Sequence, residues 1–175
     1  MAEQSSSAHA QHLSSSAVSS MSQPSKRAEQ HSGPPQTTEN IRALLVKFAW
    51  MADEAEHPNT EDFFTTDASW HLGDQSWCGR GEISEFLTEM RTAGYAGPAT
   101  GTRHIITNVD ITLSPEEPDH AQARSLFMLC APGATWAIQA VGCYDDELVR
   151  VDDHWRIHKR HVRQLPRTSN PASTS

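Results

Sequence analysis

The sequence predicts an α+β fold in which helices come first and long antiparallel strands follow. Between Glu39 and Gly94 the apolar side chains recur at helical spacing, every three or four residues. From Thr102 onward the spacing changes to alternation, which is typical of strands with one buried face. Because helices and strands occupy separate stretches of the chain, an alternating βαβ arrangement with a parallel sheet is not expected.

The first helix is predicted from Glu39 to Glu56, with Thr38 as its N-cap. It ends at His57-Pro58, because a residue that precedes proline avoids the helical region. Its core-facing stripe consists of Ile41, Leu44, Leu45, Phe48 and Ala52.

Two more helices are predicted before the long strands, which makes about three in all. Thr60 can cap a short second helix, and a short strand from Ala68 to Leu72 follows it. Gly79-Arg80-Gly81 opens the third helix, and Gly94 is a natural C-terminal stop.

Four long strands complete the predicted domain, with short polar turns between them. They span residues 102–113, 121–131, 135–151 and 155–162. Because side chains alternate along a strand, the two faces of the first one differ. One face carries Ile105, Thr107, Val109, Ile111 and Leu113, and the other carries His104, Ile106, Asn108 and Asp110. The first set is too apolar to face water, so we expect a homodimer, with a trimer as the alternative.

Both ends of the chain differ in composition from this domain, which is placed at residues 39–166. Residues 1–38 are rich in serine and contain no aromatic side chain, so we expect a disordered tail; residues 167–175 are expected to behave likewise. No apolar run suggests a signal peptide or a membrane span. Cys78, Cys130 and Cys143 are odd in number and not closely spaced, which favours reduced thiols and a cytoplasmic protein.

The net charge of −8 argues against a nucleic-acid partner. A basic stretch near the C-terminus is the exception to this acidic balance. We interpret it as an exposed strand whose cations pair with carboxylates elsewhere in the chain. Its members are Arg156, Lys159, Arg160, Arg163 and Arg167.

Asp53 and His104 are the residues with the clearest chemical potential. Imidazole titrates near neutral pH, so His104 can take up and return a proton. Asp53 lies at the edge of the apolar stripe of the first helix, from which it could lean over a sheet packed on that helix. The alternative interpretation of Asp53 is a solvated carboxylate near a helix end.

The domain resembles the SnoaL-like members of the NTF2-like superfamily, which has a cystatin-like cone fold. The resemblance covers most of residues 39–164. It is carried by Asp53 at the end of the first helix, Phe64-Thr65-Thr66-Asp67-Ala68-Ser69-Trp70, Gly79-Arg80-Gly81-Glu82-Ile83, Thr102-Arg103-His104, Thr107-Asn108, the run from Gly142 to Arg150, and Trp155-Arg156-Ile157. It implies a curved, mostly antiparallel sheet whose open end is closed by helices around a pocket.

The resemblance also implies chemistry, because the superfamily includes polyketide cyclases, ketosteroid isomerase and scytalone dehydratase. Asp53 and His104 match an aspartate and a histidine that pair in the dehydratase relatives. The implied function is cofactor-independent acid–base catalysis on a small, apolar, oxygenated molecule, by dehydration, isomerisation or cyclisation. A polyketide cyclase and a non-catalytic small-molecule-binding or assembly module remain alternatives, and so does a purely structural Asp–His hydrogen bond.

The remaining candidate residues concern the binding of a small-molecule substrate. Asn108 and Tyr144 could hold a substrate oxygen, while Phe48, Trp50 and Trp70 could form the walls of an apolar pocket. Trp136 is a further candidate for the wall. His154, His158 and His161 invite a metal interpretation, but alternation along a strand separates His158 from His161. We therefore expect neither a metal nor another cofactor.

Overall fold

The computed structural model describes residues 33–166. Residues 1–32 of the predicted N-terminal tail and the predicted tail at 167–175 lie outside the described residues, whereas residues 34–38 belong to a helix, so the predicted tail boundary at residue 38 is wrong. The described elements are, in order, α1 (Pro34–Glu54), β1 (Phe64–Leu72), β2 (Gln75–Cys78), α2 (Gly79–Thr92), β3 (Arg103–Leu113), β4 (His120–Ala131), β5 (Ala137–Val151) and β6 (His154–Gln164).

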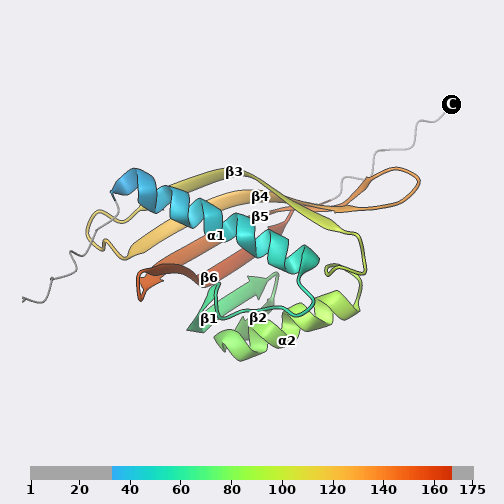
Figure 1. Cartoon of the computed structure of the whole chain (residues 1–175), viewed down its shortest axis with the longest axis horizontal. Helices are drawn as coiled ribbons and strands as arrows, with labels where there is room; N and C mark the ends of the chain where they lie inside the picture. The colour runs from blue at the N-terminus through green and yellow to red at the C-terminus, as the bar shows by residue number, and fades with distance from the viewer. Residues whose placement is uncertain (1–32, 167–175) are drawn as a thin grey trace, which may run out of the picture. The chain divides into compact units, whose positions relative to one another are not determined.

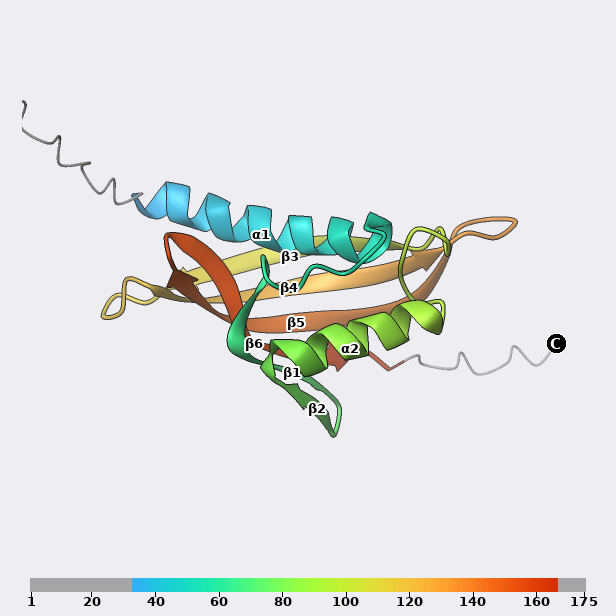
Figure 2. The same ribbon diagram turned by 60° about the horizontal axis from the view of Figure 1, so that its bottom comes forward.

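The strands form one six-stranded curved sheet in the order β2-β1-β6-β5-β4-β3. All neighbouring strands pair antiparallel except β1 and β6, which run parallel. Helix α1 lies along β3, and α2 lies along β1 and β2, so the helices cover the inner side of the sheet (Figures 1 and 2). This arrangement confirms the predicted α+β cone fold.

The core forms where α1 meets the inner face of the sheet. Ile41, Leu45 and Phe48 of α1 are almost fully buried. The Phe48 ring packs edge-on against Phe63 and Phe64, with centroids 5.6 Å apart in both pairs. This aromatic contact joins the helix to the start of β1.

The part of the chain that the structure describes contains two helices, so the prediction of three is wrong. Thr60 does not cap a helix; its carbonyl accepts bonds from the amides of Phe63 and Phe64, and the chain then turns into β1. The first helix also begins earlier than predicted. It starts at Pro34, because proline is well suited to the first helical turn, where its missing N–H would have no helical partner. Thr38 therefore lies inside the helix, with its hydroxyl bonded to the carbonyl of Pro35.

A β-bulge at Asn108 changes the predicted faces of β3. The pairing with β4 shifts between Thr107 and Asp110, and Asn108 has a φ of +50°. One extra residue reverses the alternation. Val109, Ile111 and Leu113 therefore pack against the core on the same side as Ile106, and the predicted outward position of these three residues is wrong. Asn108 itself is exposed.

Two of the basic residues of β6, Lys159 and Arg163, pair with carboxylates on β5 as expected from the sequence. Lys159 Nζ lies 3.3 Å from Glu147, and Arg163 Nε lies 2.8 Å from Asp145.

The expected exposure is wrong for Arg160, which is buried, and Arg156 donates to the carbonyls of Glu61 and Val151 instead of to a carboxylate. Arg167 lies outside the described residues.

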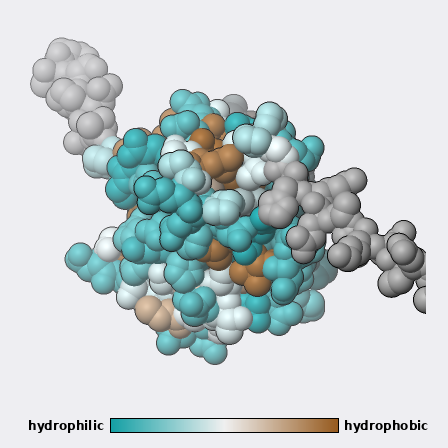
Figure 3. All heavy atoms as spheres, turned by 90° about the vertical axis from the view of Figure 1, so that its left-hand side faces the viewer, coloured by the Kyte–Doolittle hydropathy of each residue, from teal (hydrophilic) through white to brown (hydrophobic). Residues whose placement is uncertain are grey.

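Figure 3 shows a mainly hydrophilic surface at the left-hand end of Figure 1, where hydrophobic residues occur only in small separate patches. Within residues 33–166 neither helix has the combined length and apolarity needed to cross a bilayer.

Gly142 provides a test of the packing inside the sheet. A methyl group at this position would lie 2.6 Å from the Arg163 carbonyl and would collide with the Phe127 ring. Gly142→Ala should therefore lower the free energy of unfolding by about 1–3 kcal/mol, as overpacked cores do. Chemical denaturation measures the change.

Gly81 of α2 supplies the matched control, because an added methyl group there meets no heavy atom within 4 Å. Gly81→Ala should be neutral or stabilise the protein by up to about 1 kcal/mol, since alanine favours helices. Equal destabilisation by both substitutions would contradict the packing described for Gly142.

Candidate functional site

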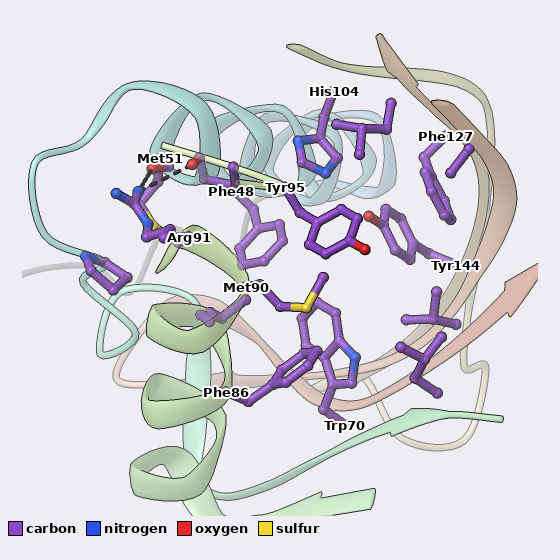
Figure 4. A pocket seen from close by; sticks show the side chains of 18 of the residues that line it. Phe48, Met51, Trp70, Phe86, Met90, Arg91, Tyr95, His104, Phe127 and Tyr144 are labelled. Carbon is purple, nitrogen blue, oxygen red and sulfur yellow. Dashed lines mark hydrogen bonds between the residues drawn. The ribbon is translucent and has the colours of Figure 1, made fainter. Parts of the chain in front are cut away.

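A cavity of about 350 Å³ lies between the two helices and the inner face of the sheet (Figure 4). Most of its wall is apolar and comes from α1, α2, β1 and β4. The main apolar residues are Phe48, Met51, Trp70, Phe86, Met90 and Phe127. Polar side chains also border it, among them His104, Tyr95, Tyr144 and Arg91. The cavity therefore suits an apolar molecule with a few polar atoms.

Asp53 and His104 are joined by two hydrogen bonds. Asp53 lies in the last turn of α1 and is 2% exposed. Its Oδ2 accepts the backbone N–H of His104 at 2.7 Å, and its Oδ1 lies 2.6 Å from His104 Nδ1. Because an ionised carboxylate can only accept, this contact assigns the imidazole proton to Nδ1. Nε2 is then left with a free lone pair, and the ring borders the cavity.

Arg91 of α2 fixes the end of the helix that carries Asp53. Its guanidinium donates to the carbonyls of Met51 (2.8 Å), Ala52 (3.1 Å) and Ala55 (2.6 Å). Cations are favoured at helix C-termini, where carbonyls lack helical partners. Partial burial lowers the pKa of Arg91 from its ordinary value, while the nearby charge of Asp53 opposes that effect.

Tyr144 of β5 contributes a buried phenol to the opposite wall. Its ring stacks on Phe127 with centroids 4.5 Å apart, and the guanidinium carbon of Arg160 lies 4.2 Å from its centroid. Burial raises the pKa of Tyr144 to about 12, although the positive charge of Arg160 opposes the rise. The Tyr144 hydroxyl is therefore a neutral hydrogen-bond donor across the physiological range.

Arg160 and Asp146 form an ion pair behind this wall. Arg160 Nε and Nη2 contact the two carboxylate oxygens of Asp146 at 2.7 and 2.8 Å, and both side chains are 1% exposed. Burial opposes the charge on Arg160, but Asp146 raises the pKa of the guanidinium above its usual value. Arg160 Nη1 and Trp70 Nε1 are buried without a partner among the described residues. The pair thus holds a fixed charge beside Tyr144 and keeps spare donor capacity.

Three of the predicted pocket residues line the cavity, and two do not. Phe48, Trp70 and Tyr144 line it. Trp50 is 56% exposed and borders a separate surface depression, because it lies on the side of α1 that faces away from the cavity. Asn108 is turned outward by the bulge, and its Oδ1 accepts the Thr107 hydroxyl. Trp136, the further candidate, is 62% exposed and does not line the cavity.

Tyr95 and Arg91 are the pocket residues that sequence reasoning missed. Gly94 identified a helix end, and Tyr95 is the next residue, on a loop that also contains Gly97 and Gly101. The signal that could have identified Tyr95 was an aromatic residue among glycines, in the loop that leads to the strand of His104. Arg91 offered a weaker one, as a cation in the last turn of a helix.

No group of three or more His, Cys, Asp or Glu side chains within residues 33–166 is arranged to hold a metal ion. His158 lies near Asp67 and Thr65, whereas the His161 ring stacks on His71 at 4.4 Å. His158 and His161 therefore belong to separate surroundings.

Comparison with known proteins identifies the domain. Residues 36–161 match the SnoaL-like domain. No curated protein matches the chain. Among solved structures, an NTF2-like protein with a cystatin-like fold from Novosphingobium aromaticivorans is 20% identical, with a TM-score of 0.63, over 77% of this chain and 86% of that one.

Two further solved structures share the fold, with similar sequence identities and TM-scores. A protein provisionally named scytalone dehydratase, also from Novosphingobium aromaticivorans, is 21% identical over 81% of this chain and 96% of that one, with a TM-score of 0.61. Rv3472 from Mycobacterium tuberculosis, of unknown function, is 22% identical over 79% of this chain and 82% of that one, with a TM-score of 0.60. At these identities the likeness establishes the fold alone.

The raised pKa of Tyr144 can be measured directly, because the chain contains only two tyrosines. In Tyr95→Phe, the phenolate absorbance should appear with a midpoint of about 12, reached by a rapid pH jump before alkaline unfolding. A midpoint near the ordinary value of about 10 would show that Tyr144 is solvated.

The same shift has a defined effect on stability. The folded state holds the Tyr144 proton more tightly than the unfolded state. The protonated phenol therefore contributes to the free energy of unfolding, and this contribution is complete below pH ~10. It is then lost as the pH rises through the folded-state value of about 12. Tyr144→Phe lacks the phenol hydroxyl, so its free energy of unfolding, measured by chemical denaturation, should depend less on pH in this window than that of the wild type.

Proposed function

Because the chain belongs to the SnoaL-like family, we propose that it is an acid–base enzyme that acts on a small, apolar, oxygenated molecule without a cofactor. The observation that carries the proposal is His104 at the cavity wall: its Nδ1 is bonded to a buried carboxylate, and its Nε2 has no hydrogen-bond partner within residues 33–166. Such a histidine can remove a proton from a molecule bound in the cavity.

The reaction would begin at a carbon next to a carbonyl group. His104 Nε2 takes the proton, the electrons of the C–H bond form an enolate, and Asp53 stabilises the resulting imidazolium. The Tyr144 hydroxyl lines the same cavity and could donate to the enolate oxygen. Return of the proton to another carbon isomerises the substrate. In a dehydration, a hydroxyl group on the next carbon takes the imidazolium proton and leaves as water. In a cyclisation, the enolate attacks a second carbonyl, whose oxygen takes that proton.

Cyclisation would make the protein a SnoaL-type polyketide cyclase, which is the alternative within this chemistry. The alternative outside it is a non-catalytic binding or assembly module, for which a filled cone with a packed His104 would be expected. An open cavity of about 350 Å³ bordered by His104 favours the enzyme.

Proton removal is common to all three reactions, so it can be tested without the natural substrate. The protein should catalyse exchange of the acidic hydrogens of β-tetralone, a two-ring ketone, for deuterium in heavy water. His104→Ala should lower the exchange rate by about 10²–10⁴-fold, since the base is lost. Asp53→Asn should also lower it strongly, because the imidazole loses its orienting anion. Proton NMR of the ketone measures the rate.

His158→Ala is the matched control, because this histidine lies on β6 beside Asp67 and does not line the cavity. It should retain the full rate, and treatment with EDTA should leave the rate unchanged. Circular dichroism should show that the His104 and Asp53 variants remain folded. Undiminished exchange by folded His104→Ala would refute its role as base.

The proposal includes self-association as a homodimer, with a trimer as the alternative. With Val109 and Ile111 inside, the surface that supports it is an outer sheet patch that crosses β3, β4 and β5. Cross-strand pairing places its members on one face. They are Ile105, Leu126, Met128, Cys130, Ile138, Val141 and Cys143. A second copy of the same patch would cover these apolar groups.

Sedimentation at micromolar concentration should therefore report a dimer. Met128→Lys, in the middle of the patch, should shift it to a monomer, because the dimer would bury an unpaired charge. Gln122→Lys, on an exposed part of the same strand, should leave the dimer intact. A monomeric wild-type protein would exclude the patch as an interface.

A further inference from the structure

Tyr95 is a polar cavity residue for which the chemistry above has no role. It lies in the loop between α2 and β3, lines the cavity, and is 49% exposed. Figure 4 shows its ring entering the cavity, with its hydroxyl on the side of Tyr144. Within the described residues the Tyr95 hydroxyl has no hydrogen-bond partner, so its donor is available to a ligand.

The backbone around Tyr95 is fixed, although the side chain is partly exposed. Its N–H donates to the Met90 carbonyl at 3.0 Å, and its carbonyl accepts the hydroxyl of the buried Thr102 at 3.4 Å. Two residues later, Gly97 N–H donates to the Ala52 carbonyl at 2.9 Å. Because Ala52 directly precedes Asp53, the loop that presents Tyr95 is bonded to the helical turn that orients His104.

The two guanidinium groups near the cavity are less suited to bind a ligand oxygen. Arg91 is already engaged by three backbone carbonyls, and Arg160 lies behind the wall in its pair with Asp146. The deeper wall consists of aromatic side chains such as Trp70 and Phe86, whose centroids are 5.6 Å apart. The wall at this end is therefore mainly aromatic, with Trp70 Nε1 as its one donor that the structure leaves without a partner among the described residues, and Tyr95 and Tyr144 supply the hydroxyl donors of the cavity.

We propose that Tyr95 binds the acceptor oxygen of the ligand, with Tyr144 as a second donor, and that the apolar body of the ligand occupies the space beside Trp70 and Phe86. The ligand is then a molecule with a compact apolar body and a carbonyl or enolate oxygen at one end. This inference deepens the proposed function, because it orients the carbon next to the carbonyl towards His104. It also makes Tyr95 a residue that determines specificity.

A pair of closely similar probes tests this assignment. β-Tetralone carries one carbonyl oxygen, and tetralin has the same two-ring skeleton without it. Equilibrium dialysis should show that Tyr95→Phe weakens β-tetralone binding about 2- to 10-fold, the range for one neutral hydrogen bond. Tetralin binding should stay within about 2-fold of wild type, because the ring is kept.

Tyr144→Phe should give the same selective loss, and Tyr95→Phe combined with Tyr144→Phe should abolish the preference for the ketone. An equal loss for both probes would reduce Tyr95 to an apolar wall residue and overturn the proposal, and so would an unchanged affinity for the ketone. Failure of wild type to bind β-tetralone would overturn it as well.

The same measurement in His104→Ala separates this inference from the proposed function. The preference for the ketone should persist there, since Tyr95 and Tyr144 are intact. If wild type shows this preference but no deuterium exchange, the enzyme proposal fails and the binding site stands. If exchange depends on His104 but β-tetralone binding is insensitive to Tyr95→Phe, the enzyme proposal stands and the role of Tyr95 is refuted.

Discussion

The carboxylate of Asp53 holds the helix and the sheet of this protein in a single geometry. Its two oxygens bind two different atoms of His104, the backbone nitrogen and Nδ1. The backbone bond fixes where β3 begins relative to α1, and the side-chain bond fixes the direction of the imidazole. Because Arg91 and Gly97 bind the same end of α1, the walls of the cavity are built around this contact.

Charge is arranged in two layers around the apolar cavity. His104 and Asp53 stand at its edge, whereas Arg160 and Asp146 are buried behind Tyr144. A buried ion pair is weak evidence for stability, since desolvation opposes the attraction between the charges. Its effect here is positional, because the guanidinium packs against the faces of Phe48, Trp70 and Tyr144. These rings are thereby held at the wall in defined orientations.

The sequence was sufficient for the class of fold, because that depends on local spacing and on the order of the motifs. The Asp53–His104 contact joins segments 51 residues apart, and it was expected only from the family resemblance. Asn108 was misplaced because alternation assumes an unbroken strand, and nothing in its neighbours announces a bulge. Trp50 was misplaced because an aromatic residue on a helix suggests burial, although here it faces outward. Tyr95 and Arg91 were missed because their positions depend on how the loop after α2 meets the end of α1, a contact between distant segments.

The position of β3 at the end of the sheet gives α1 a protective role. Edge strands expose unpaired N–H and C=O groups, which can recruit a strand from another molecule. Here side chains of α1 occupy such groups, since Asp53 accepts the His104 N–H and Arg42 donates to the Val109 carbonyl. The bulge at Asn108 interrupts the row between them. The carboxylate that orients the imidazole thus also occupies one of the edge groups with which a strand of another molecule could pair.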